Sequence, residues 1–273
     1  MAILNTRCSM GATLLTLTCL SPVAMADEPC GELDECRVLI EINASDGDIG
    51  FHVLFDAEGW TEATISDPSS MPIFEESASN SLEDQTLTEN FFESSEPVCE
   101  EELKEDPEDE FQTLTDFLLR FPAGTYSFSL DSGDQEGSTV LTHTIPAAPA
   151  EVDFDGKRIS WEYGDDLGEC TTVPGGFEVA DEDDIAGYEV VLEPDDDELS
   201  KFKFTIQVPP EVNEVVVPKA YLRSLGDDTP LKVEVGAIEE RPDGSFGNQT
   251  FTEEDGFCAA RNQKKCEQEE VED

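Results

Sequence analysis

Apolar and polar residues alternate in short runs along the second half of the chain, and proline, glycine or aspartate separates one run from the next. Arg158-Ile-Ser-Trp161 opens the series, Gly187-Tyr188-Glu-Val190 and Val215-Val-Val217 continue it, and Leu231-Lys-Val233-Glu-Val235 is the last long run. Successive side chains of a β-strand point to opposite faces, so this alternation predicts strands with one buried face. Many short strands between turn residues are typical of an antiparallel β-sandwich.

The order and spacing of these runs resemble a fibronectin type III domain over residues ~146–251. In that frame, strands A, B, C, C′, E, F and G fall at residues 151–154, 158–163, 186–192, 201–208, 212–217, 231–238 and 245–251. Trp161 is then the core aromatic residue. Leu231 stands where the family usually has a tyrosine, and the connection over residues 164–185 is longer and more acidic than usual. The arrangement also resembles secreted bacterial proteins with one such domain, which implies export but no activity.

The chain between residues 36 and 146 carries a second series of strand-like runs. Val38-Leu-Ile40-Glu-Ile42 comes first, followed by Gly50-Phe-His-Val-Leu-Phe55, whose aromatic residues share one face by period two. Further runs lie at residues 60–65, 72–74, 87–92, 125–130 and 139–145. This half therefore also predicts mostly β structure.

One helix is expected within this first half, over residues ~107–120. Asp106 suits the N-cap and Pro107 the first helical position. Apolar residues then recur at helical spacing: Phe111, Leu114, Phe117, Leu118 and Phe121. Pro122 and Gly124 end the helix.

The segment Phe121-Pro-Ala-Gly124-Thr-Tyr126 resembles the turn into strand F of immunoglobulin-like sandwiches, where a tyrosine hydroxyl bonds to the backbone upstream. The resemblance implies an immunoglobulin-like β-sandwich with the helix in its E–F connection. A different α+β fold is the alternative for this half.

The chain as a whole is expected to be mostly β, with two tandem sandwiches of the immunoglobulin and fibronectin type III kind. Residues 1–26 read as a secretory signal peptide, since an apolar run precedes Ala24-Met25-Ala26. Residues 27–146 and 147–257 are the two predicted domains, and residues 258–273 form an acidic polar tail. No later stretch approaches the ~20 apolar residues of a membrane span. The protein is therefore expected in the periplasm, at the cell surface or outside the cell.

The charge is extreme. The chain has 65 acidic residues against 15 basic ones, a net charge of −50. Such a surface repels nucleic acid and anionic lipid, so neither is an expected partner. Calcium binding, a basic partner and adaptation to a salty medium each account for the acidity. The acids are spread over the whole chain, which favours a generally acidic, solvated surface.

Six cysteines follow the predicted signal peptide, and an even number in an exported chain indicates disulfides. Proximity in sequence favours Cys30–Cys36 and Cys258–Cys266, which leaves Cys99 and Cys170 for each other. The last pair would join the two domains. Pairing of Cys170 with Cys258 or Cys266 is the alternative. The absence of a C-x-x-C motif disfavours zinc sites of that kind and redox chemistry.

A calcium site is the one cofactor that the sequence suggests. Asn43, Asp46 and Asp48, with Ser45 between them, offer oxygen ligands at alternate positions of a turn. They lack the EF-hand register and its terminal glutamate, and a plain hairpin turn explains the same residues.

No catalytic motif is present in the sequence. The two histidines, His52 and His143, both lie in the first domain. As a pair they could bind a metal, but we expect each to be a strand residue without a common site. The chain lacks H-E-x-x-H, G-x-S-x-G and a phosphate-binding loop. The expectation is an exported, non-catalytic binding or structural protein that meets a protein or glycan at the cell exterior. The alternative is a calcium-dependent carbohydrate-binding module or small hydrolase with its site in the first domain.

Overall fold

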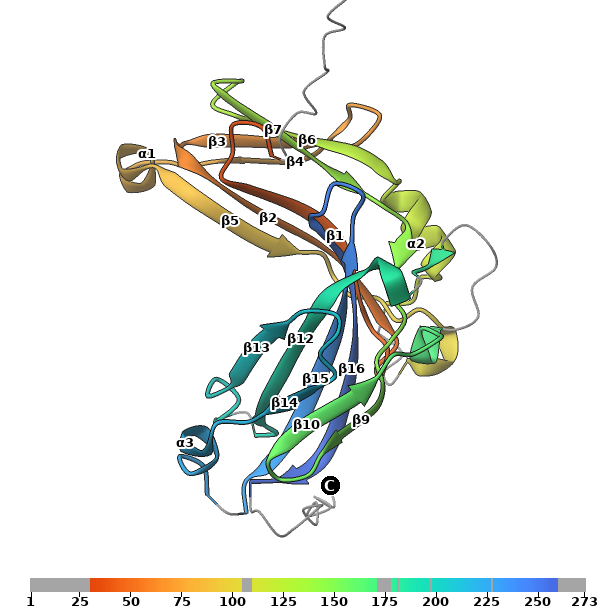
Figure 1. The fold of residues 1–273 in the computed structure, drawn as a ribbon. Coiled ribbons are helices and arrows are strands. Elements are labelled where there is room, and N and C mark those ends of the chain that lie inside the picture. The colour runs from red at the N-terminus through yellow and green to blue at the C-terminus, as the bar shows by residue number, and fades with distance from the viewer. Residues whose placement is uncertain are drawn as a thin grey trace, which may run out of the picture.

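The fold is mostly β and consists of two sandwiches (Figure 1). This computed structural model describes residues 30–104, 110–170, 178–180, 182–196, 198–226 and 228–259. The predicted signal peptide and most of the predicted tail lie outside these residues. Two separate clusters of buried apolar side chains form the cores of the two sandwiches. No helix in the described ranges is long and apolar enough to cross a membrane.

The first sandwich has a three-stranded layer and a four-stranded layer. The three strands, in spatial order, are β5 (Leu87–Glu93), β2 (Asp48–Trp60) and β1 (Glu35–Asn43). The four are β4 (Pro72–Ser77), β3 (Glu62–Ser66), β6 (Gly124–Leu130) and β7 (Gln135–Leu141). Phe55, Trp60 and Phe128 lie between the layers and are fully buried. The Tyr126 hydroxyl donates to the Pro122 carbonyl oxygen at 3.2 Å, which confirms the tyrosine turn at the start of β6.

The second sandwich contains all seven strands predicted for it. One layer holds β9 (Ala150–Phe154), β10 (Arg158–Glu162) and β14 (Glu214–Val216), which are strands A, B and E. The other holds β13 (Phe204–Val208), β12 (Ile185–Pro194), β15 (Pro230–Glu240) and β16 (Phe246–Cys258), which are C′, C, F and G. This is the strand order of a fibronectin type III sandwich. The first sandwich has the same order, with β5, β2 and β1 in the places of E, B and A.

Minor elements connect these strands. They are β8 (Thr144–Ile145), β11 (Glu178–Val179), α1 (Ser81–Gln85), α2 (Leu114–Arg120), α3 (Lys219–Leu222) and the 3-10 turns η1 (Glu101–Leu103), η2 (Gly168–Cys170) and η3 (Glu182–Asp184). β8 and β11 pair with each other in parallel, which holds part of the long B–C connection against the link between the sandwiches.

The predicted start of the helix was wrong. Helix α2 lies in the expected E–F connection, but it begins at Leu114 rather than at Pro107, which falls outside the described residues. The Thr113 hydroxyl caps the helix by accepting the Asp116 backbone N–H at 3.1 Å. Residues 110–112 cannot be helical because Val98 exchanges backbone hydrogen bonds with Glu110 and Gln112 in a β-bridge.

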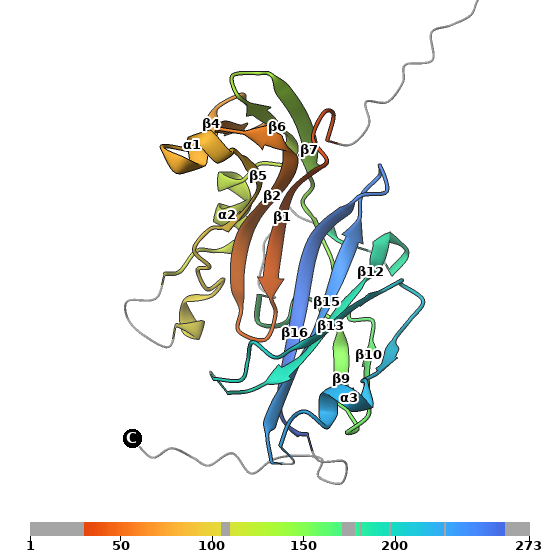
Figure 2. The ribbon, with the colours of Figure 1, turned by 90° about the vertical axis from the view of Figure 1, so that its left-hand side faces the viewer.

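The two sandwiches share a sheet, which the sequence did not predict. Strand β1 pairs in parallel with β16, where Glu41 lies opposite Gln249 and Asn43 opposite Phe251. The pairing joins the three-stranded layer of the first sandwich to the four-stranded layer of the second. The result is one seven-stranded sheet in the order β13-β12-β15-β16-β1-β2-β5, which runs through both halves of the molecule (Figure 2).

Both cores lie on the same face of this sheet. Ile42 of the first core is opposite Thr250, Thr250 is opposite Ala237, and Ala237 is opposite Tyr188, so these residues share a face. Ala237 and Tyr188 belong to the second core. The three-stranded sheet β14-β10-β9 and the four-stranded sheet β4-β3-β6-β7 therefore cover one face, on the outer side of the bend between the sandwiches (Figure 1). Among the described residues, no further sheet covers the opposite face, called the open face below.

Two disulfides are present in the described chain, Cys30–Cys36 and Cys99–Cys170. The second links the first sandwich to the B–C connection of the second, where Leu167 and Cys170 belong to the first core. The third expected pair, Cys258–Cys266, involves Cys266, which lies outside the described residues.

Candidate metal centre

A histidine and several carboxylates meet on the open face where β1, β2 and β5 run side by side. The register places Glu41 of β1 opposite Gly50 of β2, and His52 of β2 opposite Glu93 of β5. Their neighbours Ile40, Phe51 and Val53 point to the covered face and fill the core. Glu96 follows β5 and approaches the same group of side chains.

His52 is the centre of this group and is only 7% exposed. Its Nδ1 lies 3.9 Å from a Glu41 carboxylate oxygen. Its Nε2 lies 3.7 Å from Glu96 Oε1 and 3.9 Å from Glu93 Oε2. These separations are too long for hydrogen bonds, and the buried Nε2 has no hydrogen-bond partner among the described residues. One ligand atom each from Glu41, His52 and Glu96 lies within 4.8 Å of the others, close enough to hold a metal ion.

Burial and mutual repulsion change the pKa values of the residues in this cluster. Burial and the nearby carboxylates of Glu96, Glu189 and Glu93 raise the pKa of Glu41 to about 8. Burial and the Glu96 carboxylate also raise the pKa of Asp48 to about 6. Burial lowers the pKa of His52, which favours the neutral imidazole with a free lone pair. The site therefore combines a neutral nitrogen ligand with carboxylates that a cation would stabilise in their charged form.

A cavity of about 730 Å³ continues from this group towards the junction of the two sandwiches. Its lining includes five acidic residues: Asp46, Asp48, Glu96, Glu110 and Glu169. Glu96 takes part in both the cavity and the histidine cluster. The cavity is therefore an acidic hollow, suited to cations and not to anions.

Two of the three predicted calcium residues form a turn. The Asn43 Oδ1 accepts the backbone N–H groups of Ser45 and Asp46 at 3.1 and 3.3 Å, and its amide donates to Asp46 Oδ2 at 2.8 Å. This is an Asx turn, the alternative considered from the sequence. Asp48 of β2 lies opposite Asn43, and its carboxylate accepts the Asn43 backbone N–H and lies near the carboxylates of Asp46 and Glu96. Calcium at Asn43, Asp46 and Asp48 stays a prediction.

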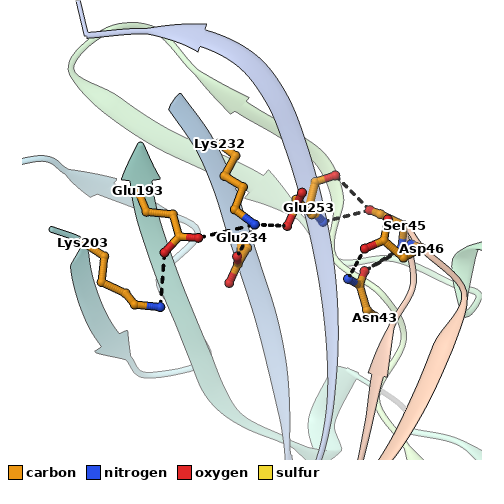
Figure 3. A network of polar contacts seen from close by, with 8 residues as sticks. All are labelled: Asn43, Ser45, Asp46, Glu193, Lys203, Lys232, Glu234 and Glu253. Atoms are coloured by element: carbon orange, nitrogen blue, oxygen red, sulfur yellow. Dashed lines mark hydrogen bonds and ion pairs between the residues drawn. The ribbon is translucent and has the colours of Figure 1, made fainter. Parts of the chain in front are cut away.

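The turn connects the two sandwiches (Figure 3). Its Ser45 hydroxyl donates to the Glu253 carbonyl oxygen and accepts the Glu253 backbone N–H, both at 2.9 Å. The Glu253 side chain in turn accepts from Lys232 Nζ at 2.8 Å. Lys232 also pairs with Glu193 and Glu234 at 3.4 and 3.3 Å. The turn is therefore part of a polar network across the junction.

The sequence did not single out Glu41, Glu93 or Glu96, and it gave His52 no ligand partner. Alternation along β1 and β2 could have placed Glu41 and His52 on the face opposite the core. Glu96 reaches His52 only because the chain after β5 passes back beside β2, and no local sequence pattern predicts that path. His143 is separate from the cluster, as expected, and its Nε2 lies 2.9 Å from the Phe121 carbonyl oxygen.

The fold and this site define a protein of two fibronectin-type sandwiches that share a sheet, with an acidic, histidine-containing cluster on the open face. No family model matches the chain, and no curated protein matches it. Solved structures that align with most of the chain include the following two. The FN1–FN3 domains of chicken CNTN1 align over 80% of this chain with 10% identity and a TM-score of 0.27. The BSP domain of a biofilm associated protein aligns over 82% with 12% identity and a TM-score of 0.22.

This chain spans 65% of the first of those structures and 29% of the second. Likeness at this level identifies no family. The assignment of the fold therefore depends on the strand order and register described above.

Proposed function

We propose that this chain is an exported, non-catalytic binding or structural protein whose open sheet face meets a basic protein surface. The observation that carries the proposal is the distribution of charge on that face. Its strands carry many carboxylates that share the orientation of Glu41, among them Glu89, Glu93, Glu189, Glu193, Glu234 and Glu253. Its lysines Lys203 and Lys232 are already engaged with these carboxylates.

Two exposed aromatic rings flank the carboxylates and favour a protein partner. Phe91 on β5 is 56% exposed, and Phe246 at the start of β16 is 37% exposed. The Arg37 guanidinium lies 5.8 Å from the centre of the Phe246 ring. Aromatic side chains are enriched at protein interfaces, and complementary charge speeds and orients association. Acidic groups with flanking aromatic rings therefore suit a basic protein surface.

The shared sheet and the Cys99–Cys170 bridge support the same proposal. They fix the two halves of the open face relative to each other before any partner arrives. A preorganised surface loses less conformational entropy on binding than a flexible one. The disulfides are also of the kind that persists in oxidising compartments, which agrees with export.

The test must separate binding to this face from attraction to an acidic protein in general. Glu89→Lys with Glu189→Lys changes two open-face positions, and Glu62→Lys with Glu75→Lys makes the same charge change on the covering sheet. Binding of an oligolysine peptide is measured at physiological ionic strength. We expect the open-face pair to weaken binding by about tenfold more than the control pair. At this ionic strength salt screens charges that lie far from the bound peptide, so only carboxylates close to it contribute strongly to binding. An equal loss in both pairs would show that the open face is not the binding surface.

A further inference from the structure

We propose that the open face holds a divalent transition-metal ion of the Zn²⁺ class, bound by the His52 imidazole and the carboxylates of Glu41 and Glu96. The inference does not depend on the basic partner proposed above. The three residues come from β1, β2 and the segment after β5, and one ligand atom of each lies within 4.8 Å of the others. Glu93, with an oxygen 3.9 Å from His52 Nε2, can complete the coordination.

The histidine distinguishes this group from an ordinary cluster of acids. Its ring is more than nine-tenths buried, and Nε2 has no hydrogen-bond partner in the described part of the chain. A buried polar nitrogen without a partner is costly in a folded protein. Its nearest acidic neighbours on either side are Glu96 at 3.7 Å and Glu93 at 3.9 Å. A metal ion bound to the nitrogen and to these carboxylates would satisfy all of them.

Gly50 provides a second, independent observation. A Cβ atom at this position would lie 2.7 Å from His52 Nε2 and 2.9 Å from Glu96 Oε1. Both distances are shorter than real Cβ contacts, so any side chain here would enter the space between the two ligand groups. The Gly50 backbone is not in the left-handed region, so the conformation of β2 does not itself require glycine. Glycine within a strand often marks a close approach by a ligand or a backbone, and here it borders the two ligand atoms.

The ligand chemistry selects the class of metal. Calcium and magnesium take oxygen ligands, so an imidazole at the centre of the site argues against them. One nitrogen with two or three carboxylate oxygens suits Zn²⁺ and related divalent ions. The ion would also neutralise the repulsion between Glu41, Glu93 and Glu96. Metal binding there should therefore stabilise the folded state.

Nitrogen NMR of the histidine rings tests the proposal directly. The chain has only two histidines, so the ring signals of His52 are identified by their loss in His52→Gln. Zn²⁺ is added to the full-length protein at neutral pH, and Ca²⁺ is added in a parallel experiment. We expect one equivalent of Zn²⁺ to move the His52 signals and leave those of His143 in place. Calcium should move neither set.

Three variants keep His52 and decide whether the effect belongs to this site. Gly50→Ala places a methyl group between the ligands, and Glu96→Gln removes one ligand from a partly exposed segment. In both, we expect zinc affinity at His52 to fall on the order of 100-fold. Even residues that only hydrogen-bond to metal ligands typically change metal affinity by about 10- to 100-fold when they are replaced. Glu89→Gln, on the same face of β5, should bind zinc as the wild type does. The proposal would be overturned if zinc did not move the His52 signals of the wild type. It would also be overturned if zinc moved them in Gly50→Ala and Glu96→Gln as readily as in the wild type.

Discussion

At the scale of single residues, Asn248 is the polar group on which the junction most depends. It is fully buried, and its side-chain oxygen accepts the Ile40 backbone N–H at 2.8 Å. Its amide donates to the carbonyl oxygens of Thr142 and Thr144 at 3.2 and 2.8 Å. One side chain from β16 therefore satisfies backbone groups of the first sandwich and of the link. Its hydrogen bonds hold β16 beside β1 where the parallel pairing begins.

Replacement of Asn248 by alanine should destabilise the protein strongly. The variant leaves a buried N–H and two carbonyl groups without their partners, and each unsatisfied buried group costs about 1–3 kcal/mol. We expect the free energy of unfolding to fall by about 3 kcal/mol, measured by urea denaturation. Gln249→Ala, one residue along β16 and partly exposed, should cost within about 0.5 kcal/mol. A similar small loss for Asn248→Ala would mean that the junction does not rely on this side chain.

At the scale of elements, the start of α2 shows how a distant contact can override a local signal. Asp106, Pro107 and the periodic apolar residues predicted a helix of about four turns. Val98 instead pairs with residues 110–112 through backbone hydrogen bonds, so the helix is limited to Leu114–Arg120. Thr113 then takes over as the N-cap, and the Asp116 backbone N–H is its partner.

Thr113 should therefore be the residue whose loss weakens α2. Thr113→Ala removes the capping oxygen and is expected to cost about 1 kcal/mol of unfolding free energy. Thr113→Ser keeps the hydroxyl and should stay close to the wild type, because serine and threonine both cap well. Urea denaturation of the two variants makes the comparison. Equal stability of the alanine and serine variants would contradict this account of the helix start.

The strands were more predictable than the site. Apolar and polar residues alternate around Trp161, Tyr188 and Val233, which directly indicates strands with one buried face. The corresponding strands β10, β12 and β15 lie close to their expected positions. The parallel contact between β1 and β16 joins residues about 200 positions apart and leaves no local pattern. The same limit applies to the metal centre, because His52 and Glu96 meet only through the path of the chain after β5.

At the scale of the whole molecule, two independent features hold the sandwiches together: the shared sheet and the Cys99–Cys170 bridge. The bridge closes a loop of 71 residues, for which the chain-entropy model gives about 4 kcal/mol. The sheet does not depend on the bridge. Stability and shape should therefore respond differently to loss of the disulfide.

We expect Cys99→Ser with Cys170→Ser to lower the free energy of unfolding by up to about 4 kcal/mol while the radius of gyration stays unchanged. Denaturation measures the first quantity, and small-angle X-ray scattering measures the second. Cys30→Ser with Cys36→Ser, which opens a loop of only six residues, is the matched control and should cost less. An expanded or two-lobed scattering profile in the Cys99–Cys170 variant would show that the shared sheet alone cannot hold the halves together.

The net charge sets the response of the molecule to salt. With 65 acidic and 15 basic residues, carboxylates repel one another over most of the surface, and much of the described positive charge is already paired, as Lys232 and Arg158 show. The reach of this repulsion falls from about 10 Å at 0.1 M salt to about 3 Å at 1 M. The folded state concentrates charge more than the unfolded chain does, so screening should favour folding.

The melting temperature should therefore rise as NaCl is raised from 0.1 to 1 M in the presence of a chelator, measured by calorimetry. Above pH 8, Glu41→Gln should make the rise smaller, because burial and the neighbouring acids raise the pKa of Glu41 to about 8 and its carboxylate is then ionised among them. The same variant should melt higher than the wild type at low salt. Below pH 8 the wild type must take up a proton at Glu41 to fold, and above pH 8 it must bury the charge. Glu62→Gln, at an exposed position of the four-stranded sheet, should change neither the melting temperature at low salt nor its rise with NaCl appreciably. A flat salt response would mean that pairing within the chain already compensates the acids, and equal behaviour of the two variants would place the repulsion elsewhere than at the metal centre.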